Sequence, residues 1–289
     1  ARRAHVNPGY LSQIEHGTRT PSATVLRALS DVLGVDLRLP VAVAVEPVHV
    51  DLNPDAPRLL AGVLAGQRRL EDSIGARPLV TTVDTQAQLV GGLAAEARGP
   101  LRTEVLDVAS QWAQFAGWLH TATGDYAGAH RWFDRAMALA TETGDRDMIA
   151  TALSFKGHIA HLTGKPGAVV GLSRAAAREG DYIGQRAYDA FQEAKGHAML
   201  GDRRAAANLL ATAVDLAEQS DAYTGLVPPW QYYRSPGFWL LESADVHRLL
   251  GQTLRAGDLI AQGLATLPED QRDSEWAQSY RRDLDAATR

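Results

Sequence analysis

The chain has 289 residues, of which 45% are hydrophobic and 22% are charged. This length is enough for one large or two ordinary domains, and the composition excludes a wholly disordered chain. The chain has no cysteine, which excludes a disulfide framework and a cysteine nucleophile and favours a cytoplasmic location. No stretch of about 18 apolar residues occurs, so we predict no membrane-spanning helix and no membrane partner.

The net charge of −5 is unevenly distributed along the chain. Residues 1–40 contain five arginines and three acidic residues, a balance of +2, which leaves −7 for residues 41–289. A small basic segment beside an acidic body indicates two functions, one of which involves a polyanion.

The first 35 residues predict two short helices. Asn7 is a typical N-cap, Pro8 occupies the first helical position, and Gly17 ends the first helix. The segment Thr20-Pro21-Ser22 begins the second helix, which has an apolar stripe at helical spacing: Val25, Leu26, Leu29, Val32 and Leu33. Four prolines then punctuate the chain between residues 40 and 57, which predicts a linker with at most a short strand at Val41–Val45.

Alanine-rich amphipathic helices continue from residue 58 to the C-terminus and form an internal repeat. The turns of four predicted helical hairpins are marked by Gly124, Gly164, Gly201 and Gly251, at spacings of 40, 37 and 50 residues. Small residues such as Gly117 recur where paired helices should cross, and large residues such as Phe133 fill the gaps between them. Helices at about 58–75 and 79–97 form an additional, divergent hairpin. The sequence therefore predicts an all-α fold with a solenoid of helical hairpins.

The segment from Val6 to Ser22, followed by Leu26, Leu29 and Leu33-Gly34-Val35, resembles the XRE-type (lambda-repressor/Cro-like) helix-turn-helix domain. In that family the helix corresponding to Pro8–His16 enters the major groove of DNA. The resemblance implies a partial DNA-binding domain over residues 1–39, because the chain begins inside the family's second helix and we expect an N-terminal truncation. Pro8 and Gly9 depart from the family pattern, since relatives often place base-reading side chains there.

The chemistry of the exposed side chains fits DNA binding. Leu11 and Ile14 are expected to face the domain core, whereas Tyr10, Ser12 and Gln13 face outward. Gln13 is the strongest candidate for base reading, because its amide can bond bidentately to adenine. Phosphate or groove contacts are expected from Asn7, Thr18, Arg19 and Thr20. The alternative is an ordinary helical hairpin whose arginines are only solvated.

The hairpins resemble tetratricopeptide repeats, although Lys156 and Glu193 stand where that family usually buries an apolar residue. The first helices of such hairpins line a concave surface, which suits a peptide or small-molecule effector. The predicted lining residues are Gln111, Gln114, Trp118, Thr151, Ser154, His158, His161, Tyr188, Phe191, Lys195, Phe238, Asp245 and Arg248. The aromatic insertion at Tyr223–Pro236 is either a wall of this groove or part of the core.

A helix-turn-helix segment followed by repeats resembles the peptide-pheromone-responsive regulators of Gram-positive bacteria and the XRE-type regulators of actinobacteria, which implies effector-controlled transcription. The resemblance implies a homodimer that binds a double-stranded DNA operator, with residues 58–289 as the sensing and dimerisation domain. The alternative is a repeat scaffold for protein–protein interaction with a vestigial DNA-binding segment.

Catalytic and metal-binding signals are weak. His158 and His161 are three residues apart but have no third ligand, and no catalytic or dinucleotide motif is present, so we expect no enzyme, metal or cofactor. His120, His197 and His247 recur at one repeat position, where a structural role at the hairpin turn is expected.

Overall fold

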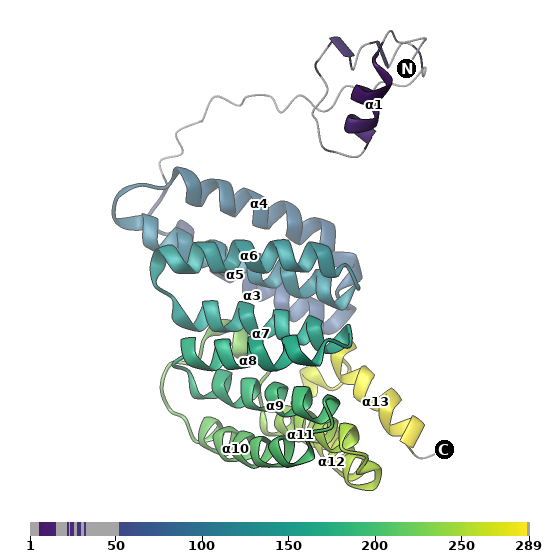
Figure 1. Ribbon diagram of the computed structural model, residues 1–289. Coiled ribbons are helices and arrows are strands. Elements are labelled where there is room, and N and C mark those ends of the chain that lie inside the picture. The colour runs from purple at the N-terminus through teal and green to yellow at the C-terminus, as the bar shows by residue number, and fades with distance from the viewer. Residues whose placement is uncertain are drawn as a thin grey trace. The chain divides into compact units, whose positions relative to one another are not determined.

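The computed structural model describes residues 6–15, 22, 24–25, 28–29, 32 and 52–287 (Figure 1). The chain divides into two compact units, residues 1–50 and residues 51–289. Every regular element among the described residues is helical, in agreement with the predicted all-α fold. In this part of the chain no helix is both long enough and apolar enough to cross a membrane.

The first unit contains helix α1 (Pro8–Glu15) and helical residues 24–25, 28–29 and 32. The predicted cap is confirmed, because the Asn7 side chain accepts a hydrogen bond from the Gly9 backbone N–H at 2.8 Å. Val6 and Leu29 are buried together in a small apolar cluster. The predicted strand at residues 41–45 lies outside the described residues.

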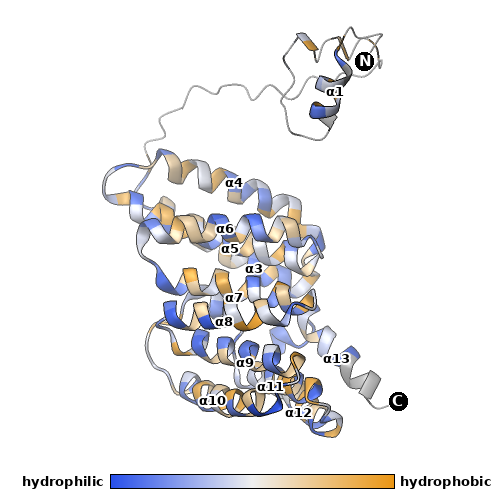
Figure 2. Ribbon diagram, in the orientation of Figure 1, coloured by the Kyte–Doolittle hydropathy of each residue, from blue (hydrophilic) through white to orange (hydrophobic). Residues whose placement is uncertain are grey.

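The second unit consists of eleven α-helices among the described residues. Their bounds are α3 (Ala56–Ile74), α4 (Val80–Glu96), α5 (Arg102–Ala122), α6 (Tyr126–Thr143), α7 (Arg146–Leu162), α8 (Pro166–Glu179), α9 (Ile183–Met199), α10 (Arg203–Asp221), α11 (Pro236–Leu249), α12 (Thr253–Thr266) and α13 (Glu275–Ala287). Short 3-10 helices lie at η2 (Arg77–Leu79), η3 (Gly99–Leu101), η4 (Pro229–Gln231) and η5 (Glu269–Gln271). Figure 2 shows hydrophilic and hydrophobic residues on each of these α-helices, as expected for amphipathic helices that stack in layers.

Helix α3 begins at Ala56, two residues before the predicted start at residue 58. Pro57 lies in its first turn, where a missing backbone N–H leaves no hydrogen bond unmade. The proline that indicated a linker therefore starts the helix instead.

Four of the predicted hairpins are confirmed by the stacking of α5 on α6, α7 on α8, α9 on α10 and α11 on α12. The additional hairpin predicted from helices at 58–75 and 79–97 is wrong, because α3 and α4 each pack against α5 rather than against each other. Each of the four predicted turn glycines adopts a left-handed conformation, for example φ 83° at Gly124. At the predicted crossing of α5 and α6, a Cβ on Gly117 would lie 2.6 Å from Phe133 Cε1. Glycine is therefore required there for the two helices to approach each other.

The repeated histidines have the expected structural role. The Nδ1 atom of His120 lies 2.8 Å from Asp125, whose carboxylate also accepts from the Gly128 backbone N–H as the N-cap of α6. His247 Nδ1 is hydrogen-bonded to Gln252, which precedes α12, whereas His197 Nδ1 lies 3.6 Å from Asp202, which precedes α10. Each histidine thus connects the end of one helix to the start of its hairpin partner.

The polar residues Lys156 and Glu193 fit this packing through ion pairs. Lys156 pairs with Asp134 of α6, and Glu193 pairs with Arg174 of α8 at 2.6 Å. In both cases a charged residue on the preceding helix replaces the apolar contact that the repeat pattern led us to expect.

Candidate functional site

The second unit contains a partly open cavity of about 290 Å³. The first helices of the hairpins, α5, α7, α9 and α11, form one side of it, and α3, α13 and the chain between α10 and α11 complete it. Ten aromatic side chains line it: Phe115, Trp118, Phe155, Tyr188, Trp230, Tyr232, Tyr233, Phe238, Trp276 and Tyr280. Its size is near the lower end of the range for small-molecule pockets.

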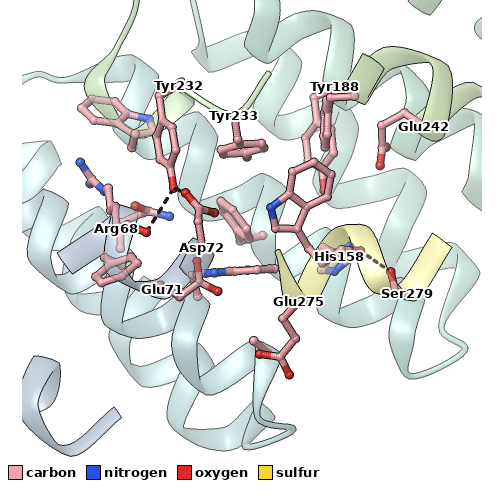
Figure 3. Close-up of a pocket in the computed structure, with 18 of the residues that line it drawn as sticks. Arg68, Glu71, Asp72, His158, Tyr188, Tyr232, Tyr233, Glu242, Glu275 and Ser279 are labelled. Atoms are coloured by element: carbon pink, nitrogen blue, oxygen red, sulfur yellow. Dashed lines mark hydrogen bonds between the residues drawn. The ribbon is translucent and has the colours of Figure 1, made fainter. Parts of the chain in front are cut away.

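One wall is the segment that joins α10 to α11, residues 222–235, which we call the aromatic connection. The Trp230 indole donates to Thr151 of α7 at 3.0 Å, and the Gln231 amide donates to Gln185 of α9 at 2.8 Å. Tyr232 then donates its hydroxyl proton to the Asp72 carboxylate on α3 at 2.7 Å (Figure 3). The insertion therefore contributes both to the core, through Trp230 and Gln231, and to the cavity wall.

A second wall is the C-terminal helix α13. The Glu275 carboxylate accepts from the Ala76 backbone N–H at 3.0 Å, which joins α13 to the end of α3. Tyr280 donates to Glu242 of α11 at 2.9 Å, and the Trp276 ring lies 5.9 Å from that of Phe238. These contacts bring the first and last helices of the unit together and close the concave face.

Helix α3 supplies the most unusual polar groups of the cavity: Arg68, Glu71 and Asp72. All three are buried, and Arg68 is only 4% exposed. Burial lowers the pKa of Arg68 to about 10, which leaves it cationic at neutral pH. Burial, reinforced by the charge of Asp72, raises the pKa of Glu71 to about 8, so that this carboxyl group is mostly protonated at neutral pH. Burial also raises the pKa of Asp72, although the hydrogen bond from Tyr232 opposes this shift.

The histidine in the cavity is neutral. Burial, together with the charge of Lys195, lowers the pKa of His158 to about 3. The same two causes lower the pKa of His161 to about 4. Among the described residues no group of three or more histidine and acidic side chains could hold a metal ion.

Beneath the cavity lies a buried charge network. The Lys195 ammonium contacts Glu242 at 2.9 Å and Asp245 at 3.1 Å. Burial favours the neutral amine, but the two carboxylates outweigh this effect and raise the pKa of Lys195. Glu242 and Lys195 therefore compensate each other, and Glu242 is not available as a counter-ion for another cavity group.

The predicted effector residues divide into two sets. Those that line the cavity are Gln114, Trp118, His158, Tyr188 and Phe238. Those that do not are Gln111, Thr151, Ser154, His161, Phe191, Lys195, Asp245 and Arg248. Phe191 is fully buried and stacks on Trp239, because α9 packs against α8, α10 and α11 at once. Ser154 is hydrogen-bonded to the buried Asp189 of the same helix α9.

Several cavity residues were not predicted from the sequence. Arg68, Glu71 and Asp72 belong to a helix outside the repeat frame, and Trp276 and Tyr280 belong to the last helix. The available signal was weak: α3 places Arg68 and Asp72 four residues apart, on the same helix face as the buried Leu64.

The candidate DNA-binding residues are partly described. Ser12 and Gln13 are exposed on α1 as expected, and Asn7 is occupied by its capping bonds. Tyr10, which was expected to face outward, is half-buried and packs against the Val6–Leu29 cluster. Thr18, Arg19 and Thr20 lie outside the described residues.

Comparison with known proteins bears on the N-terminal segment. No curated protein matches the chain significantly. Residues 1–39, however, match the family model described as helix-turn-helix. This N-terminal segment is therefore similar to helix-turn-helix DNA-binding domains, which supports, at a coarse level, a DNA-binding regulator.

Proposed function

We propose that the protein is a transcription regulator whose first unit binds operator DNA and whose second unit binds a small-molecule effector without catalysis. The observation that supports this proposal is the aromatic cavity, with its buried charged groups, in the same chain as a helix-turn-helix match. A cavity of about 290 Å³ favours a small molecule over a peptide of many residues.

Helix α3 is well placed to couple the two functions. It follows directly after the segment that connects the units, and it contributes Arg68, Glu71 and Asp72 to the cavity. An effector that contacts these side chains favours one position of α3 over others. A shift in that position would change the separation of the DNA-binding units in a dimer.

The outer face of α3 supports a homodimer. Leu59, Val63, Leu70 and Ile74 lie along this face and are between 42% and 58% exposed. Gly62 and Gly66 lie among them, and no atom is found within 4 Å of where their Cβ atoms would be. A second copy of α3 could therefore approach closely and cover the apolar face. Pairing through α3 would also bring together two connecting segments, as binding to two operator half-sites requires.

A genomic-fragment binding selection with the native protein tests the regulator proposal. We expect enrichment of one sequence motif, with affinity that falls steeply as salt rises. Gln13→Ala should reduce the preference for the motif by roughly ten-fold or more, because a bidentate amide–adenine pair contributes about 1–3 kcal/mol of discrimination.

Arg19→Ala should reduce the salt dependence by about one phosphate contact, whereas Arg255→Ala, an exposed arginine of the second unit, should leave it unchanged. Selection of no motif would contradict the proposal and favour a repeat scaffold.

A further inference from the structure

The buried guanidinium of Arg68 has no counter-ion among the described residues. It makes no ion pair there, and its Nε and Nη2 atoms are shielded from solvent without a hydrogen-bond partner. The guanidinium carbon lies 5.9 Å from the centroid of the Phe115 ring, a cation–π contact that supplies no negative charge. An uncompensated buried charge costs several kcal/mol, and buried charges in proteins are normally paired.

The acidic groups around the cavity do not supply the missing partner. Glu242 is engaged by Lys195 and Tyr280, and Glu275 accepts from the backbone of Ala76. Asp72 accepts from Tyr232, and Glu71 is mostly a neutral acid at neutral pH. Of the buried charges that line the cavity in the described part of the chain, that of Arg68 is therefore the least compensated, whereas Arg282 of the same lining is exposed to solvent.

Geometry and size restrict the chemistry of the missing partner. The two unpartnered nitrogens, Nε and Nη2, form one edge of the guanidinium fork, which matches the two oxygens of a carboxylate. A single guanidinium balances one negative charge, and the other buried cation, Lys195, is already paired with two carboxylates. A monoanion therefore fits better than a phosphate dianion. Flat rings such as Trp118 and Trp276 line the rest of the cavity and suit an aromatic body.

We propose that the effector is a small aromatic carboxylic acid, bound as its carboxylate to Arg68 with its ring among the tryptophans of the cavity. This inference rests on the proposed function, in that it specifies the ligand class of the same cavity. Tyr232, whose hydroxyl donates to Asp72 one turn after Arg68, belongs to the same cavity wall.

Three probes with one ring system test the charge requirement on the full chain: indole-3-acetate, indole-3-acetamide and tryptamine. In isothermal titration calorimetry we expect the acetate to bind at least ten-fold more tightly than the neutral amide, and tryptamine to bind more weakly than either. Equal binding of acetate and amide, tighter binding of tryptamine, or no binding of any probe would overturn the inference.

Two variants separate a ligand-binding role of Arg68 from a structural one. Arg68→Met should reduce acetate affinity to the level of the amide while leaving amide affinity within about two-fold. Arg282→Met, which removes an exposed arginine from the cavity lining, should retain the preference for the acetate. Retention of that preference by Arg68→Met would contradict the assignment. If Arg68→Met does not fold, the comparison of the three probes on the wild type still shows whether the cavity prefers a carboxylate.

Failure of the proposed ligand class can be distinguished from failure of the regulator proposal. Binding of the acetate without any selected DNA motif would leave the ligand class intact and contradict transcription regulation. A selected motif without acetate binding would contradict the ligand class and leave DNA binding intact.

Discussion

The unusual carboxyl group of Glu71 predicts an unusual pH dependence of stability. Its pKa is raised from 4.5 to about 8, chiefly by burial. Between pH 4.5 and about pH 8 the folded state retains a proton on Glu71 that the unfolded chain has released, so the free energy of unfolding falls as the pH rises. The sign is opposite to that of a carboxylate in a salt bridge, which stabilises the fold at high pH.

The magnitude follows from the two pKa values. Each pH unit between the unfolded and folded pKa removes about 1.4 kcal/mol, so the contribution of Glu71 falls by roughly 3 kcal/mol between pH 5.5 and pH 8. For a unit of this size that change corresponds to roughly 6–12 °C in Tm. Asp72, whose pKa is raised by burial as well, adds to the same trend.

Thermal unfolding of the full chain, followed by circular dichroism across this pH range, measures the effect. Glu71→Gln cannot release a proton, so the Tm of the variant relative to that of the wild type should increase steadily with pH. Glu218→Gln, at an exposed position on α10, should follow the wild-type pH dependence. A constant difference in Tm between wild type and Glu71→Gln at every pH would refute the reasoning.

Three further changes test the packing, the charge network and the assembly. Gly117→Ala should destabilise the fold by about 1–3 kcal/mol in urea unfolding, because its Cβ would overlap Phe133. As the control, Gly171→Ala should stabilise the fold by roughly 0.5–1 kcal/mol, because this position on α8 has open space around it. Equal effects of the two substitutions would contradict the close helix crossing. Lys195→Met should cost about 3–5 kcal/mol in the same assay, because it leaves the buried Glu242 without a cation and Asp245 with Arg248 as its remaining cationic partner. A loss below about 1 kcal/mol would count against the network. Leu70→Glu, on the outer face of α3, should convert the dimer into a monomer as measured by light scattering. Leu89→Glu, on the exposed face of α4, should leave the dimer intact. A monomeric wild type would rule out the α3 interface.

Local sequence patterns determined most of the secondary structure. Turn glycines, N-caps and small residues at helix crossings act through neighbours within a few turns of helix, so Gly124, Asn7 and Gly117 could be interpreted correctly without coordinates. The same holds for the histidines that bridge each hairpin turn, because their partners lie five residues away.

The assignment of side chains to the concave face was less successful, for a physical reason. A stripe at helical spacing identifies one buried face, but α9 packs against helices on several sides. Phe191 and Lys195 therefore lie in the core and in a buried ion pair, although their spacing is that of the cavity residue Tyr188.

The sequence by itself determined that the chain is all-α, with a helix-turn-helix segment followed by stacked hairpins. Only the tertiary structure decided that the concave face is one side of an aromatic cavity. Two contacts close it: that of Tyr232 with Asp72 and that of Glu275 with Ala76, which join residues 160 and 199 positions apart. No local periodicity encodes such long-range contacts, and they are what place the buried charge of Arg68 in the wall of an aromatic cavity.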